Sequence, residues 1–212
     1  MGERILALNI GRPNLHLWNG MTVNSAIGKK PIEEVMLTKD GFTGDSVGNR
    51  EFHGGRDRAV CFYPYEHYEQ WEREFQKPLK SPAFGENICA ANYLEKDVYI
   101  GDIFSLGDAI IQVSQGRIPC ASISKHNRVD QLLSRVVETG YTGYFFRVLQ
   151  EGLVNAESQL LLIDRKQEKF SVLTGNQIMF HKHNNREAIE EFSQVEELAE
   201  VWKSKLIKKI SK

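Results

Sequence analysis

The residues best suited to chemistry lie near the middle of the chain, in the segment Gln115-Gly116-Arg117-Ile118-Pro119-Cys120. This segment directly follows a predicted strand over Ala109 to Ser114, so Cys120 is expected on the loop that leaves the strand. Arg117 precedes the cysteine, and a positive neighbour stabilises the thiolate, which is both the nucleophile and the ligand that soft metals prefer. Cys120 is therefore the predicted reactive sulfur.

The other two cysteines have apolar neighbours. Cys61 lies within Val60-Cys61-Phe62, and Cys89 follows Ile88. A free cysteine in such a run usually behaves as a small core residue. The three cysteines are widely spaced and include no C-x-x-C pair, which predicts neither a disulfide framework nor a cysteine-rich zinc site.

Three glycine-containing segments could line a pocket. Gly44-Asp45 comes first, and His53-Gly54-Gly55-Arg56-Asp57-Arg58 follows it. Glycines let backbone N–H groups approach a ligand and arginine offers several donors, so the second segment predicts either an oxyanion-binding loop or a hairpin with a surface ion pair. Phe84-Gly85-Glu86-Asn87 fits the polar wall of a pocket or a simple turn.

A cysteine–histidine hydrolase is an alternative that the residue types alone leave open. His16, His53 and His126 are each available as a base for Cys120. No nucleophile-elbow glycine pattern surrounds the cysteine, which weakens this alternative.

The hydrophobic pattern predicts a chain of short strands followed by a helical tail. The predicted strands are Ile5 to Ile10, Thr22 to Ile27, Val35 to Leu37, Ala59 to Phe62, Val98 to Ile100, Ala109 to Ser114 and Gln159 to Ile163. The predicted helices are Pro64 to Phe75, Val129 to Val137 and Arg186 to Phe192. A capping box of Ser193 and Glu196 is expected to begin a last helix, with Val195, Leu198, Trp202 and Leu206 facing inward.

The composition indicates a globular enzyme-like chain. It has 212 residues, 41% of them hydrophobic, and a formal net charge of -1, which argues against general nucleic-acid binding. No window approaches the roughly 18 apolar residues of a membrane helix, so no membrane partner is expected. The N-terminus runs straight into a strand-like pattern without a signal-peptide core, which predicts a cytoplasmic location.

Taken together and in order, these segments resemble the MOSC family, named after the C-terminal domain of molybdenum cofactor sulfurase. The similar motifs are Gly44-Asp45, His53-Gly54-Gly55 with Arg58-Ala59-Val60, Phe84-Gly85-Glu86-Asn87, Ile100-Gly101-Asp102 and Arg117-Ile118-Pro119-Cys120. The early Leu8-Asn9-Ile10-Gly11-Arg12-Pro13 and the helical tail resemble the small bacterial YiiM type of the family.

The resemblance implies a mainly β fold, an antiparallel MOSC-type β-barrel with flanking helices and a small C-terminal subdomain of three helices. It places the barrel domain at residues 1–165 and the helical subdomain at residues 166–212. It also implies binding of the molybdenum cofactor (molybdopterin), with Cys120 as the molybdenum ligand or the carrier of a persulfide. His53, Arg58, Asn87 and Arg117 fall on motif positions and are the candidates for lining the anionic pterin-phosphate pocket.

Three functions follow from the resemblance. The leading hypothesis is a molybdoenzyme that reduces N-hydroxylated compounds with electrons from a separate donor. The second is a sulfur carrier, which would need a cysteine desulfurase as partner because no fused pyridoxal-phosphate domain is visible. The third is a non-catalytic cofactor-binding module, and a homodimer is possible in each case. Two departures from many relatives flank the cysteine loop: Gly116 stands where Pro is common, and Ala121 where Trp is common.

Overall fold

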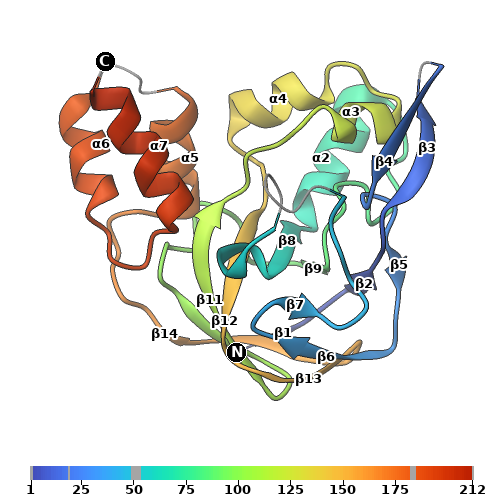
Figure 1. Cartoon of the computed structure of the whole chain (residues 1–212), viewed down its shortest axis with the longest axis horizontal. Helices are drawn as coiled ribbons and strands as arrows, with labels where there is room; N and C mark the ends of the chain where they lie inside the picture. The colour runs from blue at the N-terminus through green and yellow to red at the C-terminus, as the bar shows by residue number, and fades with distance from the viewer. Residues whose placement is uncertain (1, 19, 49–53, 182–184, 212) are drawn as a thin grey trace.

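The fold is built on one large mixed sheet, and the computed structural model describes residues 2–18, 20–48, 54–181 and 185–211 of the chain (Figure 1). The sheet has nine strands in the order β1 (Glu3–Arg4), β14 (Gln159–Asp164), β10 (Ile103–Leu106), β11 (Ala109–Gly116), β12 (Tyr144–Gln150), β8 (Val60–Pro64), β9 (Ile88–Ala90), β2 (Ala7–Ile10) and β5 (Lys30–Pro31). Neighbouring strands pair antiparallel, except that β8 and β9 are parallel.

The predicted closed barrel is not found among the described residues, where the sheet keeps β1 and β5 as its two ends. The sheet is nevertheless strongly curved. Arg4 pairs with β14 near one end, whereas Ala7 pairs with β9 near the other end. Because only Ile5 and Leu6 separate these residues, about 11 Å of chain joins the two ends. The N-terminal segment thus spans the gap that a continuous strand ladder would fill in a barrel.

Two smaller sheets complete the β structure. A three-stranded sheet has the order β13 (Gly152–Asn155), β6 (Glu34–Thr38) and β7 (Gly41–Phe42). A separate hairpin joins β3 (Asn14–Trp18) to β4 (Met21–Ser25), and it projects from the upper right of Figure 1.

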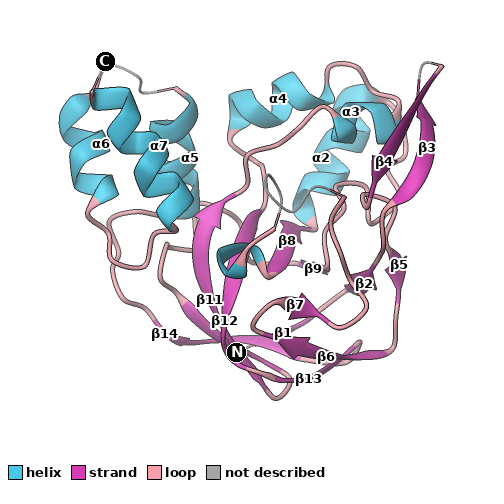
Figure 2. Cartoon of the chain, in the orientation of Figure 1, coloured by secondary structure: helices cyan, strands magenta, loops and turns pink. Residues whose placement is uncertain are grey.

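The helices form two groups above the strands (Figure 2). The first group contains α2 (Glu66–Phe75), α3 (Ser122–Asn127) and α4 (Leu132–Thr139), and the second contains α5 (Val172–Phe180), α6 (Arg186–Ser193) and α7 (Glu200–Ile210). Helix α2 buries Tyr68 and Trp71 on one face, as their helical spacing predicts. This sheet-rich fold with a helical C-terminal part confirms the coarser prediction, while the boundary at residues 165 and 166 stays a prediction.

Two predicted elements were wrong. Val98 to Ile100 is not a strand, because the Asp102 carboxylate accepts the Tyr99 N–H at 2.9 Å and the Asp102 N–H donates to the Tyr99 carbonyl at 3.0 Å. This local turn leaves Tyr99 with a single bridge to Ser171.

The predicted capping box does not begin the last helix. Ser193 is the final residue of α6, and its hydroxyl donates to the Glu190 carbonyl at 2.7 Å. Helix α7 begins at Glu200, after the Ala199 N–H has donated to the Ser114 carbonyl of β11 at 2.9 Å. A tertiary contact with the sheet therefore sets where this helix starts, although Trp202 and Leu206 are buried as predicted.

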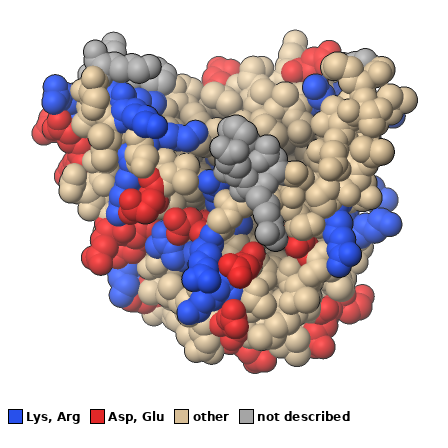
Figure 3. All heavy atoms as spheres, viewed as in Figure 1, with Lys and Arg blue, Asp and Glu red and all other residues tan. Residues whose placement is uncertain are grey.

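The surface in Figure 3 mixes both signs of charge over the lower left, while the upper right, above α3, α4 and the β3–β4 hairpin, is mostly uncharged. Within the described ranges, no helix combines the length and apolar character needed to cross a membrane.

Candidate functional site

Cys120 lies between a strand and a helix, as the sequence predicts. Strand β11 ends at Gly116, and α3 begins at Ser122. The Cys120 carbonyl accepts the Ile123 N–H at 3.2 Å, which joins the cysteine to the first turn of α3. Its side chain is half-buried, whereas Cys61 and Cys89 are buried. Of the three thiols, Cys120 is thus the one that solvent or a ligand can reach.

Gly116 lies where the C-terminal helices leave little room for a side chain. A Cβ atom at this position would lie 2.0 Å from the Asn176 Oδ1 atom of α5 and 2.9 Å from the Trp202 ring of α7. Real Cβ atoms do not approach other atoms so closely, so a larger residue would require the Asn176 and Trp202 side chains to shift. The C-terminal helices therefore pack directly against the strand that carries the cysteine loop.

Arg117 is anchored through its backbone and has an unpaired side-chain donor. Its N–H donates to the Gly143 carbonyl at 3.0 Å. Its Nη1 atom is buried and has no hydrogen-bond partner among the described residues. Burial by itself lowers the pKa of Arg117, but Cys61, Cys120 and Glu86 together raise the pKa above its usual value. The guanidinium stays charged and one of its donors is available to a ligand.

Asn87 lies in a buried polar network behind Cys61. Its Oδ1 accepts the Cys61 N–H at 3.0 Å, and its Nδ2 donates to the Asn9 carbonyl at 3.1 Å and to the Asp45 carboxylate at 2.9 Å. These contacts occupy the amide, so Asn87 holds the wall of the site together. The adjoining Asn9 Nδ2 atom is buried and has no partner among the described residues.

Lys29 is a site residue that the sequence did not reveal. Its ammonium group forms a buried ion pair with Asp45, and the Gly11 N–H donates to the same carboxylate at 2.7 Å. Asp45 belongs to a quoted motif, but Lys29 precedes another lysine in a loop, a pattern that usually indicates a solvated surface. Only the fold brings β2, the loop at Lys29 and the turn at Asp45 together.

Arg58 and His53 are the two remaining candidates for lining the site. Arg58 ends the short helix η1 (Arg56–Arg58), where burial lowers its pKa and the neighbouring Asp57 opposes that shift. The Asp57 carboxylate accepts from Arg147 Nε at 2.7 Å, and the Asp57 carbonyl accepts from the Ser114 hydroxyl at 2.5 Å. The structure therefore places Arg58 above β11 and β12, while His53 lies outside the described residues.

Two further histidines, His16 and His126, lie near each other. Their ring centroids are 6.2 Å apart, and a Cβ atom at Gly28 would contact both rings. Burial and the neighbouring His16 lower the pKa of His126, which keeps its ring neutral at pH 7. His126 is on α3, the helix that follows Cys120, so this pair lies on the hairpin side of that helix.

The arrangement suits an anionic ligand with a soft centre. Arg117 supplies a charged donor, Asn9 supplies a neutral donor, and Cys120 supplies a reachable sulfur. Buried donors without protein partners form strong hydrogen bonds when an anion binds, because burial strengthens charge-assisted hydrogen bonds.

Comparisons with known proteins agree with this fold. The MOSC domain family matches residues 49–160, and a YiiM-like, 3-alpha helix domain matches residues 171–212. The chain is 41% identical over 206 residues to the uncharacterized protein YflK of Bacillus subtilis, covering 97% of this chain and 93% of YflK. The crystal structure of YiiM from Geobacillus stearothermophilus superposes with a TM-score of 0.83 at 31% identity, covering 98% of each chain.

The chain therefore belongs to the MOSC domain family, in the form that carries a YiiM-like three-helix domain. It is also 42% identical over 145 residues to protein YiiM of Escherichia coli, covering 66% of this chain and 65% of that protein. A more distant relative from Gibberella moniliformis, named a reductase, is 32% identical over 167 residues, which cover 76% of this chain and 29% of the relative.

Proposed function

We propose that this protein binds the molybdenum cofactor at Cys120 and Arg117 and reduces N-hydroxylated compounds. The observation that carries the proposal is the half-buried Cys120 thiol on the same loop as Arg117, whose buried Nη1 atom has no partner among the described residues. Membership of the MOSC family supports the cofactor, and the relative named a reductase supports the type of reaction.

The residues present fit this cofactor. A buried, unpaired arginine donor suits the phosphate of a pterin, because an oxyanion satisfies it through charge-assisted hydrogen bonds. The Cys120 thiolate suits molybdenum as a soft ligand. When bound, the cofactor would supply the oxygen-transfer redox chemistry, and the protein supplies binding and electrostatics.

Each residue of the site has a distinct task in this proposal. Cys120 would hold the metal, and Arg117 would neutralise the anionic part of the cofactor. Lys29, Asp45 and Asn87 fix the wall formed by β2, β8 and β9, since their side chains pair with one another. Electrons would come from a separate donor protein, and the reduced product leaves from the exposed side of the cysteine loop.

The test is to load purified protein with molybdenum cofactor and to measure bound molybdenum and pterin by mass spectrometry. Wild type and the control variant Ser122→Ala are expected to retain both. Cys120→Ser should lose molybdenum, and Arg117→Gln should lose pterin by about tenfold or more in affinity. Cys120→Ala should also abolish turnover of an N-hydroxylated base.

Equal loading of wild type and Cys120→Ser would contradict the thiolate ligand. The sulfur-carrier alternative would then be tested by incubation with a cysteine desulfurase and detection of a persulfide on Cys120. Normal cofactor loading without turnover on any N-hydroxylated compound would favour the non-catalytic binding module.

A further inference from the structure

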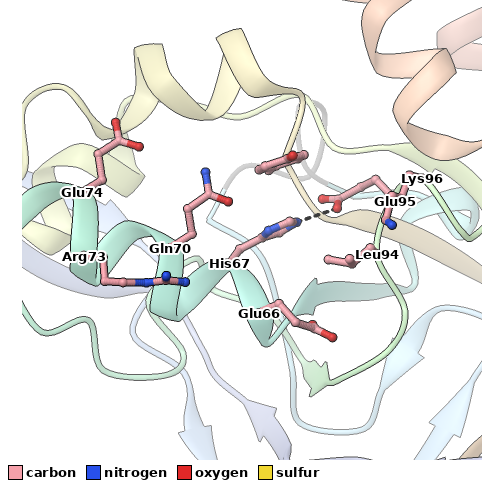
Figure 4. Close-up of a pocket in the computed structure, with 9 residues that line it drawn as sticks. Glu66, His67, Gln70, Arg73, Glu74, Leu94, Glu95 and Lys96 are labelled. Atoms are coloured by element: carbon pink, nitrogen blue, oxygen red, sulfur yellow. Dashed lines mark hydrogen bonds and ion pairs between the residues drawn. The ribbon is translucent and has the colours of Figure 1, made fainter.

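A pocket lies away from Cys120, between α2, the loop after β9 and the loop before β12 (Figure 4). Its volume is about 550 Å³, within the range that small-molecule sites occupy. Helix α2 contributes one face to it, and the residues that line it are Glu66, His67, Gln70, Arg73, Glu74, Leu94, Glu95, Lys96 and Tyr141.

The floor of this pocket is a buried histidine–glutamate pair. His67 Nε2 and Glu95 Oε2 are 2.6 Å apart, and both side chains are almost fully buried. The His67 ring also stacks on Tyr141, with 4.3 Å between the ring centroids. A carboxylate partner fixes the tautomer and the orientation of an imidazole. Both Glu95 oxygens are hydrogen-bonded, which limits the free-energy cost of burying this pair away from water.

Glu95 also connects the pocket to the backbone beside Cys120. Its Oε1 atom accepts the Gly143 N–H at 2.8 Å, and the Gly143 carbonyl accepts the Arg117 N–H at 3.0 Å. The segment from Tyr141 to Gly143 therefore separates the pocket from the candidate site described above. The two sites share this segment but none of their proposed ligand-binding side chains.

Charge is distributed unevenly between the floor and the rim. Glu66 Oε1 accepts the Asn92 N–H at 2.6 Å, while its Oε2 atom is buried with no hydrogen-bond partner among the described residues. The Gln70 amide makes no hydrogen bond within the part of the chain that the structure describes. Figure 4 shows Gln70 rising from α2 beside His67. The rim carries the exposed cations Arg73 and Lys96, while the rim carboxylate of Glu74 pairs with Arg135 of α4.

We propose that this pocket binds a small zwitterion of the amino acid class. The cationic nitrogen faces the Glu66 carboxylate, whose Oε2 atom has no partner among the described residues. The carboxylate faces the exposed Lys96 at the rim. A simple amine would meet the rim cations without compensation, and a simple acid would meet the inner carboxylates, so the ligand needs both charges.

The experiment is isothermal titration calorimetry of the full chain with glycine, β-alanine, γ-aminobutyrate, L-glutamine and L-lysine. The comparators are the matching amines without the carboxylate and the matching acids without the amine. At least one zwitterion is expected to bind with a dissociation constant below about 1 mM, and its amine and acid comparators should bind about tenfold more weakly.

Four variants test whether the zwitterion binds in this pocket. His67→Gln and Lys96→Ala should each weaken the zwitterion by about fivefold or more. Glu69→Gln on α2 and Lys80→Ala remove matched charges outside the pocket and should leave binding unchanged. Lys96 is exposed, so Lys96→Ala remains a test even where His67→Gln lowers the melting temperature.

The proposal is overturned if no zwitterion binds at about 10 mM, if an acid or amine comparator binds equally well, or if neither pocket variant weakens binding. Molybdenum and pterin loading is measured separately on the same variants. Normal loading together with lost zwitterion binding keeps this inference independent of the function proposed for Cys120.

Discussion

The Cys61 and Cys120 thiols both raise the pKa of Arg117, but the surroundings of the two thiols differ. Cys61 is buried in β8, where burial raises its pKa although Arg117 and Lys29 lower it. Cys120 is half-buried on the loop between β11 and α3. An arginine neighbour by itself is not expected to make a cysteine reactive, because access to solvent and ligand is also required.

The largest expected effect is a loss of stability when the buried polar network beside Cys61 is disrupted. Asp45→Ala should lower the free energy of unfolding by about 3–5 kcal/mol, because the buried Lys29 ammonium and the Asn87 amide lose their shared partner. Urea denaturation measures the change. The exposed pair of Asp40 and Arg56 provides the control, and Asp40→Ala should cost less than about 1 kcal/mol. Equal losses in the two variants would contradict the buried network.

The next prediction compares the rates at which the two thiols react with iodoacetamide. Iodoacetamide should modify Cys120 in the native protein at least about 100-fold faster than Cys61 or Cys89, since the buried thiols react only when the structure opens. Peptide mass spectrometry at timed intervals gives the three rates, and labelling in denaturant provides the reference. Similar native rates for Cys61 and Cys120 would remove the basis of the comparison.

A smaller effect on stability is expected where the C-terminal helices pack against Gly116, at the end of the strand before Cys120. Gly116→Ala should destabilise the fold by about 1–3 kcal/mol, because the new methyl group would meet Asn176 and Trp202. Combination with Asn176→Ala should recover at least about 0.5 kcal/mol of this cost in a double-mutant cycle. Strictly additive losses would show that Asn176 does not limit the space at Gly116.

The smallest expected effect concerns Glu86, which acts on both Cys61 and Arg117. Burial raises the pKa of Glu86, although Tyr68, Ser81 and the Phe84 N–H donate hydrogen bonds to its carboxylate. The folded state therefore holds this proton to a higher pH than the unfolded state does. Its contribution to stability is present at low pH and is lost as pH rises from the usual glutamate range through the higher folded pKa.

Glu86→Gln cannot titrate, so that part of the pH dependence should vanish. Denaturation curves between pH 4 and pH 7 should show a weaker decline of stability with rising pH in the variant than in wild type. The exposed Glu69→Gln is the control and should keep the wild-type slope. An unchanged slope in Glu86→Gln would place the pKa of Glu86 in its ordinary range.

Local pattern predicted the elements well where burial and pattern agree. The strand over Ala109 to Ser114, the helix over Pro64 to Phe75 and the helix over Arg186 to Phe192 all exist within a few residues of their predicted ends. The pattern failed where a competing contact decides: Asp102 turns the segment at Tyr99, and Ser114 fixes the start of α7. Asp102 is local and belongs to the quoted motif Ile100-Gly101-Asp102, whereas the contact between Ala199 and Ser114 joins distant parts of the chain.

The sequence by itself determined which cysteine would be reachable, since Cys61 and Cys89 follow apolar runs and Cys120 follows a strand with Arg117 and Pro119 beside it. It also determined the family through the order of its motifs. The tertiary structure alone decided that Lys29 pairs with Asp45, that a Cβ at Gly116 would meet Asn176 and Trp202, and that His67 and Glu95 pair in a pocket. The physical reason is sequence distance: these contacts join segments between 16 and 86 residues apart, and only a folded sheet brings them within hydrogen-bond or contact range.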